Sequence, residues 1–134
     1  MTSTLARMLS LGFFLLAVMG GVPARAETQI VAHPSGCPKR AFCGCGAALE
    51  VFGRHVRDLW LARNWFRFPV AEPAPGMVAV RRHHVFVIRE VRGPGLVLAY
   101  DANSGGRKTR IHLRSLSGYS VRNPHGHARY AAVR

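Results

Sequence analysis

The chain has 134 residues, with 19 Lys and Arg against 6 Asp and Glu, for a net charge of +13. This length fits one domain and excludes multidomain enzymes, barrels and doubly wound nucleotide-binding sheets. The charge favours an anionic partner. We exclude nucleic acid, because no nucleic-acid motif is present and the aromatic residues are not interleaved with arginine for base stacking. The alternative is that the arginine-rich composition serves solubility alone.

Residues 1–26 have the features of a secretory signal. Arg7 precedes the apolar run 9–19, and Ala24-Arg25-Ala26 provides a small-x-small cleavage site. The apolar run is too short to span a bilayer. We therefore predict cleavage after Ala26, export to the periplasm or the extracellular space, and no transmembrane segment in the mature chain.

The segment behind the signal is predicted to begin with helices. The polar stretch 27–36 is expected to be an exposed lead-in, because it ends in the turn residues Pro34-Ser35-Gly36. Apolar residues then recur at spacings of three and four and are interrupted by Gly53. This pattern predicts either one bent helix or two short helices, at about 45–53 and 57–65. Three prolines make 67–76 an extended connector.

Everything after Gly76 is typical of β-structure. Short apolar or β-branched runs separated by turn residues predict strands at 77–80, 85–91, 96–100, 109–113 and 119–121. Residues 125–134 have little apolar surface to bury and are expected to form a flexible basic tail. The predicted fold class is α+β, with one or two N-terminal helices packed on an antiparallel sheet of four or five strands.

The predicted hairpin of strands 85–91 and 96–100 places a hydrogen-bond partner opposite His84. If Val91 pairs with Leu96, His84 faces Asn103 at a distance that side chains can bridge. The Asn oxygen would then accept from one imidazole nitrogen and leave the other free to act as a base. Asp101 lies on the diagonal and could do the same with a charge. A slip of one residue would turn His84 to the other face of the sheet.

Three cysteines, Cys37, Cys43 and Cys45, are the candidates for a nucleophile. In an oxidising compartment, one disulfide would leave one free thiol. Cys43 and Cys45 both lie at the start of the predicted helix, where a thiolate is favoured beside a protonated His. With His84 and Asn103, such a thiol would form a Cys–His–Asn catalytic group. Alternatively, these residues are structural. A zinc site is disfavoured, because the sequence has no second pair of Cys or His at the spacing that zinc ligands usually show.

Five short motifs follow one another along the chain: Phe42-Cys43-Gly44 opening a helix, Leu61–Trp65, Pro75–Val80, His83-His84-Val85 and Asp101–Gly105. In order and spacing they resemble the cysteine, histidine-dependent amidohydrolase/peptidase (CHAP) group of the NlpC/P60, papain-like superfamily. The resemblance covers 37–124, which we take as a CHAP-like domain, and it implies a papain-like fold.

The resemblance also implies a set of site residues. It makes Cys43 the nucleophile, His84 the base and Asn103 the residue that orients the base, with Cys45 as the rival nucleophile. If Cys43 is free, Cys37 and Cys45 are the natural disulfide pair. The implied protein is a small secreted cysteine amidase or endopeptidase that cleaves peptidoglycan stem-peptide amides. It is expected to need no metal or organic cofactor and to act as a monomer on peptidoglycan or another anionic envelope polymer.

Three residues depart from the family pattern and keep other functions open. His83 replaces a glycine before the catalytic His, Phe86 replaces a small residue after it, and Met77 replaces an aspartate. This bulk could narrow the cleft or mark an inactive member. One alternative is a catalytically inactive CHAP-like module that binds wall fragments or a protein partner. Another is a secreted cationic protein that binds anionic polymers.

Overall fold

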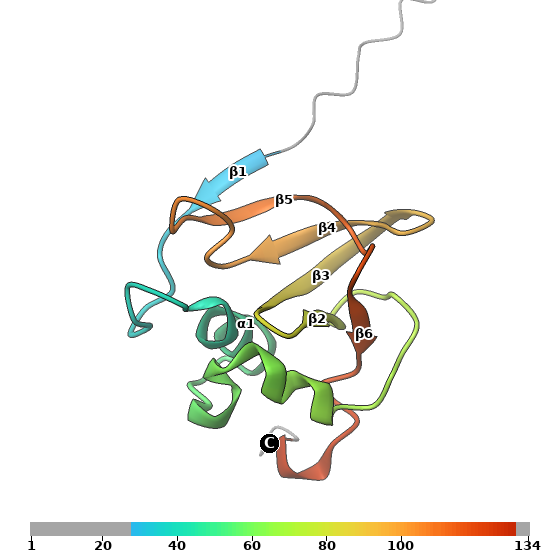
Figure 1. The fold of residues 1–134 in the computed structure, drawn as a ribbon, viewed down its shortest axis with the longest axis horizontal. Coiled ribbons are helices and arrows are strands. Elements are labelled where there is room, and N and C mark those ends of the chain that lie inside the picture. Colours follow the sequence, from blue (N-terminus) through green and yellow to red (C-terminus); the bar gives the residue numbers. More distant parts are fainter. Residues whose placement is uncertain (1–27, 131–134) are drawn as a thin grey trace, which may run out of the picture.

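A computed structural model describes residues 28–130, so the predicted signal peptide lies outside the described residues. The chain folds as α+β, with helical segments packed against one antiparallel sheet (Figure 1). No helix between residues 28 and 130 has the length and apolarity needed to cross a membrane. The α-helix (α), the 3₁₀ segments (η) and the strands (β) are, in chain order, β1 (Thr28–Val31), α1 (Cys43–Phe52), η1 (Arg57–Trp60), η2 (Ala62–Arg67), β2 (Val78–Arg81), β3 (His84–Gly93), β4 (Leu96–Asp101), β5 (Thr109–Ser115), β6 (Ser120–Arg122) and η3 (Ala128–Tyr130).

The sheet has six strands in the order β1-β5-β4-β3-β2-β6, and every neighbouring pair is antiparallel. This corrects the expected four or five strands. The additional strand is β1, which comes from the predicted lead-in and pairs with β5 from Thr28 opposite His112 to Val31 opposite Thr109. Three of its four side chains are exposed and only Val31 packs partly against the core, so the segment carries no apolar pattern and its pairing with β5 defines it as a strand.

The central strands bury apolar residues on both faces, which explains their nearly continuous apolar sequence. In β2, Val78 and Val80 pack in the cluster beneath α1, while Ala79 packs in a second cluster on the opposite face. β3 divides in the same way, with Val85 and Val87 under the helix. The second cluster consists of Ala79, Phe86, Ile88, Val97 and Ala99, with Met77, Leu116, Tyr119 and Val121 against it.

The predicted first helix is confirmed and the second is not. α1 ends at Phe52 and is capped by Gly53, whose left-handed backbone (φ 66°) lets its N–H bond to the Leu49 carbonyl at 2.9 Å. The predicted helix at 57–65 forms two 3₁₀ segments, because Leu61 between them is extended (φ −84°, ψ 119°). The carbonyl of Leu59 accepts a hydrogen bond from the buried Trp65 indole at 2.7 Å, which holds the two segments together.

Two glycines let the start of α1 approach its neighbours. A Cβ on Gly44 would lie 2.2 Å from the carbonyl oxygen of Leu59, and a Cβ on Gly46 would lie 2.4 Å from the Cβ of Ala102. Any larger residue at either position would push the helix away from η1 or from the end of β4. The two glycines therefore fix the positions of the neighbouring Cys43 and Cys45 at the start of α1.

The predicted register of the β3–β4 hairpin holds only away from the turn. Ile88 pairs with Ala99 as expected, but Val91 pairs with Val97 rather than with Leu96. Two register shifts lie between Ile88 and the end of β3, and each changes the pairing by one residue. Pairing arithmetic started from the turn therefore reached the correct register in the middle of the hairpin from an incorrect pair at its end.

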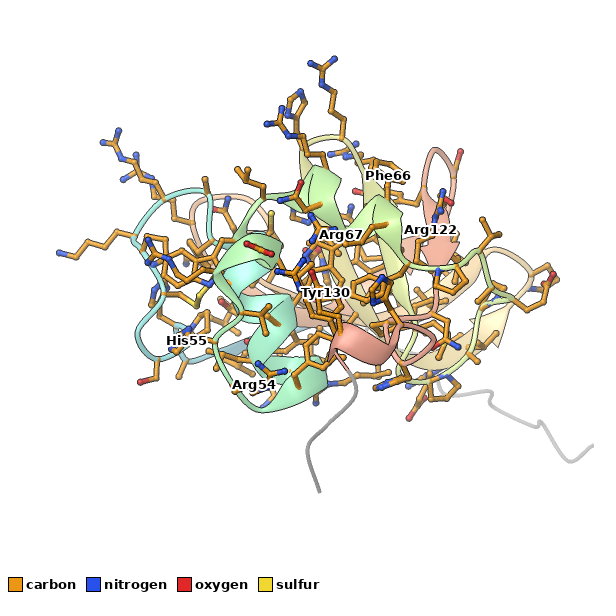
Figure 2. The ribbon with its side chains drawn as sticks, turned by 90° about the horizontal axis from the view of Figure 1, so that it is seen from below. Arg54, His55, Phe66, Arg67, Arg122 and Tyr130 are labelled. Carbon is orange, nitrogen blue, oxygen red and sulfur yellow. A yellow bond between two sulfur atoms is a disulfide. The ribbon has the colours of Figure 1, made fainter. Side chains whose placement is uncertain are left out.

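The C-terminal segment also differs from the prediction. Of the expected flexible tail 125–134, residues 125–130 pack against the helical layer, and 131–134 lie outside the described residues. Tyr130 is 3% exposed, its ring lies 5.1 Å from that of Phe68, and its hydroxyl accepts from Arg67 at 2.5 Å (Figure 2). The ring contacts of His125 with Phe52 and of His127 with Phe68 add to the burial of Tyr130 in holding this segment against the domain.

Candidate active site

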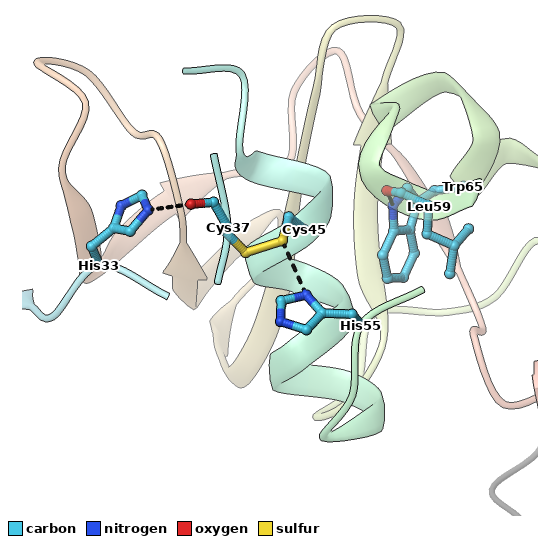
Figure 3. The surroundings of a disulfide bond; sticks show 6 residues. All are labelled: His33, Cys37, Cys45, His55, Leu59 and Trp65. Atoms are coloured by element: carbon cyan, nitrogen blue, oxygen red, sulfur yellow. Dashed lines mark hydrogen bonds between the residues drawn. A yellow bond between two sulfur atoms is a disulfide. The ribbon is translucent and has the colours of Figure 1, made fainter. Parts of the chain in front are cut away.

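Cys43 is the first residue of α1 and the chain's free cysteine. The disulfide joins Cys37 to Cys45, as predicted, with 5.8 Å between their Cα atoms (Figure 3). It ties the segment before the helix to the first turn of α1 and leaves Cys43 inside the closed loop. The pairing removes Cys45 as the rival nucleophile, because its sulfur is bonded to Cys37.

Two histidines, His33 and His55, lie close to the disulfide. His55 Nδ1 is 3.5 Å from Cys45 Sγ, and His33 Nε2 is 3.1 Å from the Cys37 carbonyl oxygen (Figure 3). The sulfur and nitrogen atoms of Cys37, Cys45 and His55 all lie within 4.8 Å of one another. Metal ligation needs thiolates, and these two sulfurs are joined to each other. The oxidised chain therefore offers no thiolate pair for a metal at this position.

His84 and Asp101 meet beside the N-terminus of α1. His84 begins β3 and Asp101 ends β4, so the antiparallel strands bring both residues to the same end of the sheet. Nε2 of His84 donates to Oδ1 of Asp101 at 2.6 Å, and both residues are buried. The thiol of Cys43 is also near enough to the ring to raise the pKa of His84. Since Nε2 is engaged by Asp101, Nδ1 is the nitrogen left for Cys43.

These contacts set the protonation state of the ring. Burial lowers the pKa of His84, but the hydrogen bonds and charges of Asp101 and Cys43 outweigh burial and raise it from 6.5 to about 9. The imidazole is therefore protonated at neutral pH. A thiol at a helix N-terminus beside an imidazolium is the arrangement that favours a thiolate. The geometry thus places the free thiol of Cys43 beside a charged imidazolium.

Asp101 is held in place by more than His84. Its side chain is fully buried, and Oδ2 accepts from Nε2 of His112 at 2.8 Å and pairs with Arg114 at 3.3 Å. Burial raises the pKa of Asp101, but the hydrogen bonds of the two histidines and the charges of His84 and Arg114 prevail and lower it below 3.8. The carboxylate is therefore ionised and fixed in orientation when it contacts His84.

Asn103 lies next to this group without joining it. It follows β4 in a turn with a left-handed backbone (φ 58°), and within residues 28–130 no hydrogen bond links it to His84. Asn103 lines the cleft that contains Cys43. The structure therefore gives His84 the diagonal partner, Asp101, and places Asn103 at the cleft wall.

The cleft beside Cys43 has a volume of about 310 Å³. Its lining residues come from the start of α1 and the segment before it, from η1 and η2 with the residue between them, from the turn between β2 and β3, and from the turn after β4. They are Ala41, Cys43, Trp60, Leu61, Ala62, Arg63, Arg82, His83 and Asn103. Ala41 and Asn103 both have positive φ, a conformation that is strained for residues other than glycine and is concentrated at functional sites. A larger hollow of about 690 Å³ beside β1 contains no cysteine or histidine.

His112 and Arg114 contact Asp101 but were not predicted as site residues from the sequence. Both lie on β5, two positions apart, so their side chains share one face of the strand. The pairing of β5 with β4 places His112 opposite Ala99, two residues before Asp101. The alternation of polar residues in 109–115 was the available signal, but it points to Asp101 only once the β4–β5 register is known.

Comparison of the chain with models of protein families finds no match. The comparisons with curated proteins and with solved structures find no significant match either. The likeness to the CHAP group therefore rests on the motifs in the sequence.

Proposed function

We propose that this protein is an exported cysteine amidase or endopeptidase of the papain-like type, acting on amide bonds of peptidoglycan stem peptides. The observation that carries the proposal is the contact of His84 with both Cys43 and a buried carboxylate. A free thiol at a helix start, a histidine protonated at neutral pH and an ionised orienting group are the parts that acyl transfer by cysteine needs. Asp101 takes the orienting role that the sequence analysis gave to Asn103.

The reaction begins with the Cys43 thiolate attacking the amide carbonyl carbon. The carbonyl oxygen gains the negative charge, and the unpaired backbone N–H groups in the first turn of α1 are placed to stabilise it. His84 then donates its proton to the leaving amine nitrogen as the C–N bond breaks, which leaves a thioester on Cys43.

The second half of the reaction releases the acyl group. Neutral His84 removes a proton from water, the water oxygen attacks the thioester carbonyl, and the C–S bond breaks to give a carboxylic acid. Cys43 leaves as thiolate and His84 is again protonated, so atoms and charge balance over the cycle. Asp101 keeps the ring in one orientation and compensates its charge throughout.

A non-enzymatic binding module remains the second candidate. Cys43 is only 5% exposed, and a module that merely binds wall fragments in the cleft would not require an accessible thiol. Such a module would use the same cleft residues but would be indifferent to the chemistry of Cys43.

Digestion of purified muropeptides distinguishes the two functions. The products of the wild-type protein and of Cys43→Ala are analysed by mass spectrometry, with circular dichroism to show that the variant is folded. The hydrolase predicts new amines and carboxylic acids with the wild type only. The binding module predicts intact muropeptides with both proteins and equal binding to them.

A further inference from the structure

The cleft beside Cys43 carries two arginines without an acidic partner. Arg63 belongs to η2, and Arg82 belongs to the turn between β2 and β3, so the two arginines line the cleft from different elements. Both residues are exposed. In the part of the chain that the structure describes, neither side chain forms an ion pair or a hydrogen bond.

Four of the five acidic residues between residues 28 and 130 are engaged elsewhere, and the fifth is Glu72. None of these five residues lines the cleft beside Cys43. The pairs they form are Glu50 with Arg89, Asp58 with Arg67 and Arg129, Glu90 with Arg92, and Asp101 with His84, His112 and Arg114. The cleft therefore has positive charge on two sides and no counter-ion supplied by its own lining, and an anion from the ligand is the group that complements it.

We infer that Arg63 and Arg82 form a carboxylate-binding subsite next to the Cys43 thiol. The ligand class is a peptide with a free carboxylate close to the amide that Cys43 attacks, a choice of substrate that rests on the proposed function. Guanidinium groups suit this role because their planar fork binds both oxygens of a carboxylate. Holding that carboxylate fixes the distance between the amide carbonyl and the thiolate.

Two small alkylating reagents test the subsite without requiring turnover. Iodoacetate and iodoacetamide both react by displacement of iodide by the thiolate to give a thioether, and they differ in the carboxylate. Cys43 is the free cysteine, so intact-mass spectrometry follows labelling at one position. The measured quantity is the ratio of the iodoacetate rate to the iodoacetamide rate, which cancels changes in the thiol itself.

We expect Arg63→Gln and Arg82→Gln each to lower this ratio about threefold at low ionic strength, and the double variant to lower it about tenfold. Arg54→Gln is the matched control, because it removes the same charge from an exposed arginine beyond the other end of α1 (Figure 2). The rise of a helix places that position about 15 Å from Cys43. The control should keep the wild-type ratio.

The subsite is refuted by an unchanged ratio in the double variant, by an equal fall in the Arg54→Gln control, or by a Cys43 that reacts with neither reagent. These outcomes are separate from those of the muropeptide digestion. A ratio that falls as expected, together with muropeptides that stay intact, would support the anion subsite and reject the hydrolase.

Discussion

The contact of His84 with Asp101 and Cys43 makes the stability of the fold depend on pH. The pKa of His84 is about 9 in the folded protein and 6.5 in the unfolded chain, so the charged imidazole ring stabilises the fold. The contribution is fully present below pH 6.5 and is lost as the pH rises through 9. The difference corresponds to about 3 kcal/mol at about 1.4 kcal/mol per pKa unit. The side chain is only 10% exposed, so solvent screening reduces this little.

Urea unfolding followed by tryptophan fluorescence measures this contribution at pH 6, 7, 8 and 9. The free energy of unfolding of the wild type should exceed that of His84→Gln by an amount that shrinks by about 3 kcal/mol over this range. The neighbouring variant His83→Gln, at an exposed position, should keep the wild-type dependence. A difference between the wild type and His84→Gln that stays constant from pH 6 to pH 9 would refute the assignment of a protonated, stabilising ring.

Three further results are expected. Asp101→Asn should lower kcat/KM on muropeptides by about 100-fold or more and Asn103→Ala by less than tenfold, because Asp101 bonds to the catalytic ring; equal losses would contradict this. Replacing Cys37 and Cys45 together with Ser should cost about 2–3 kcal/mol of unfolding free energy in urea, from loop closure alone, and no loss would show that the loop is held by other contacts. Tyr130→Ala should cost about 3 kcal/mol and expose the C-terminus to proteases, whereas unchanged proteolysis would show that this segment is not docked.

The parts of the fold that were predictable have strong local signals. Gly53 marks the end of α1 because only a residue tolerant of positive φ closes the helix there. The apolar runs that became β2, β3 and β4 are buried on both faces, so their sequences alone required strands in the interior. Cys43 at a helix start and His84 at a strand start were likewise visible from their local patterns.

The parts that were not predictable depend on distant pairing. β1 has mostly exposed side chains and forms because it pairs with the edge of β5. Nothing in the sequence of 27–36 indicates this pairing. The docking of Tyr130 requires the ring of Phe68, far away in the sequence. The choice of Asp101 over Asn103 depends on where β4 ends and a turn begins, and hairpin arithmetic assumes that the strand continues.

Mass spectrometry of the intact protein, quenched in acid during muropeptide digestion, tests the central claim most directly. The account predicts a covalent adduct with the mass of the acyl fragment, mapped to the peptide that contains Cys43 and absent in Cys43→Ala. The adduct should accumulate in Asp101→Asn less than in the wild type, because a misoriented His84 protonates the leaving amine poorly. Muropeptide cleavage by Cys43→Ala at the wild-type rate would contradict the account, as would a wild-type protein that forms neither adduct nor product.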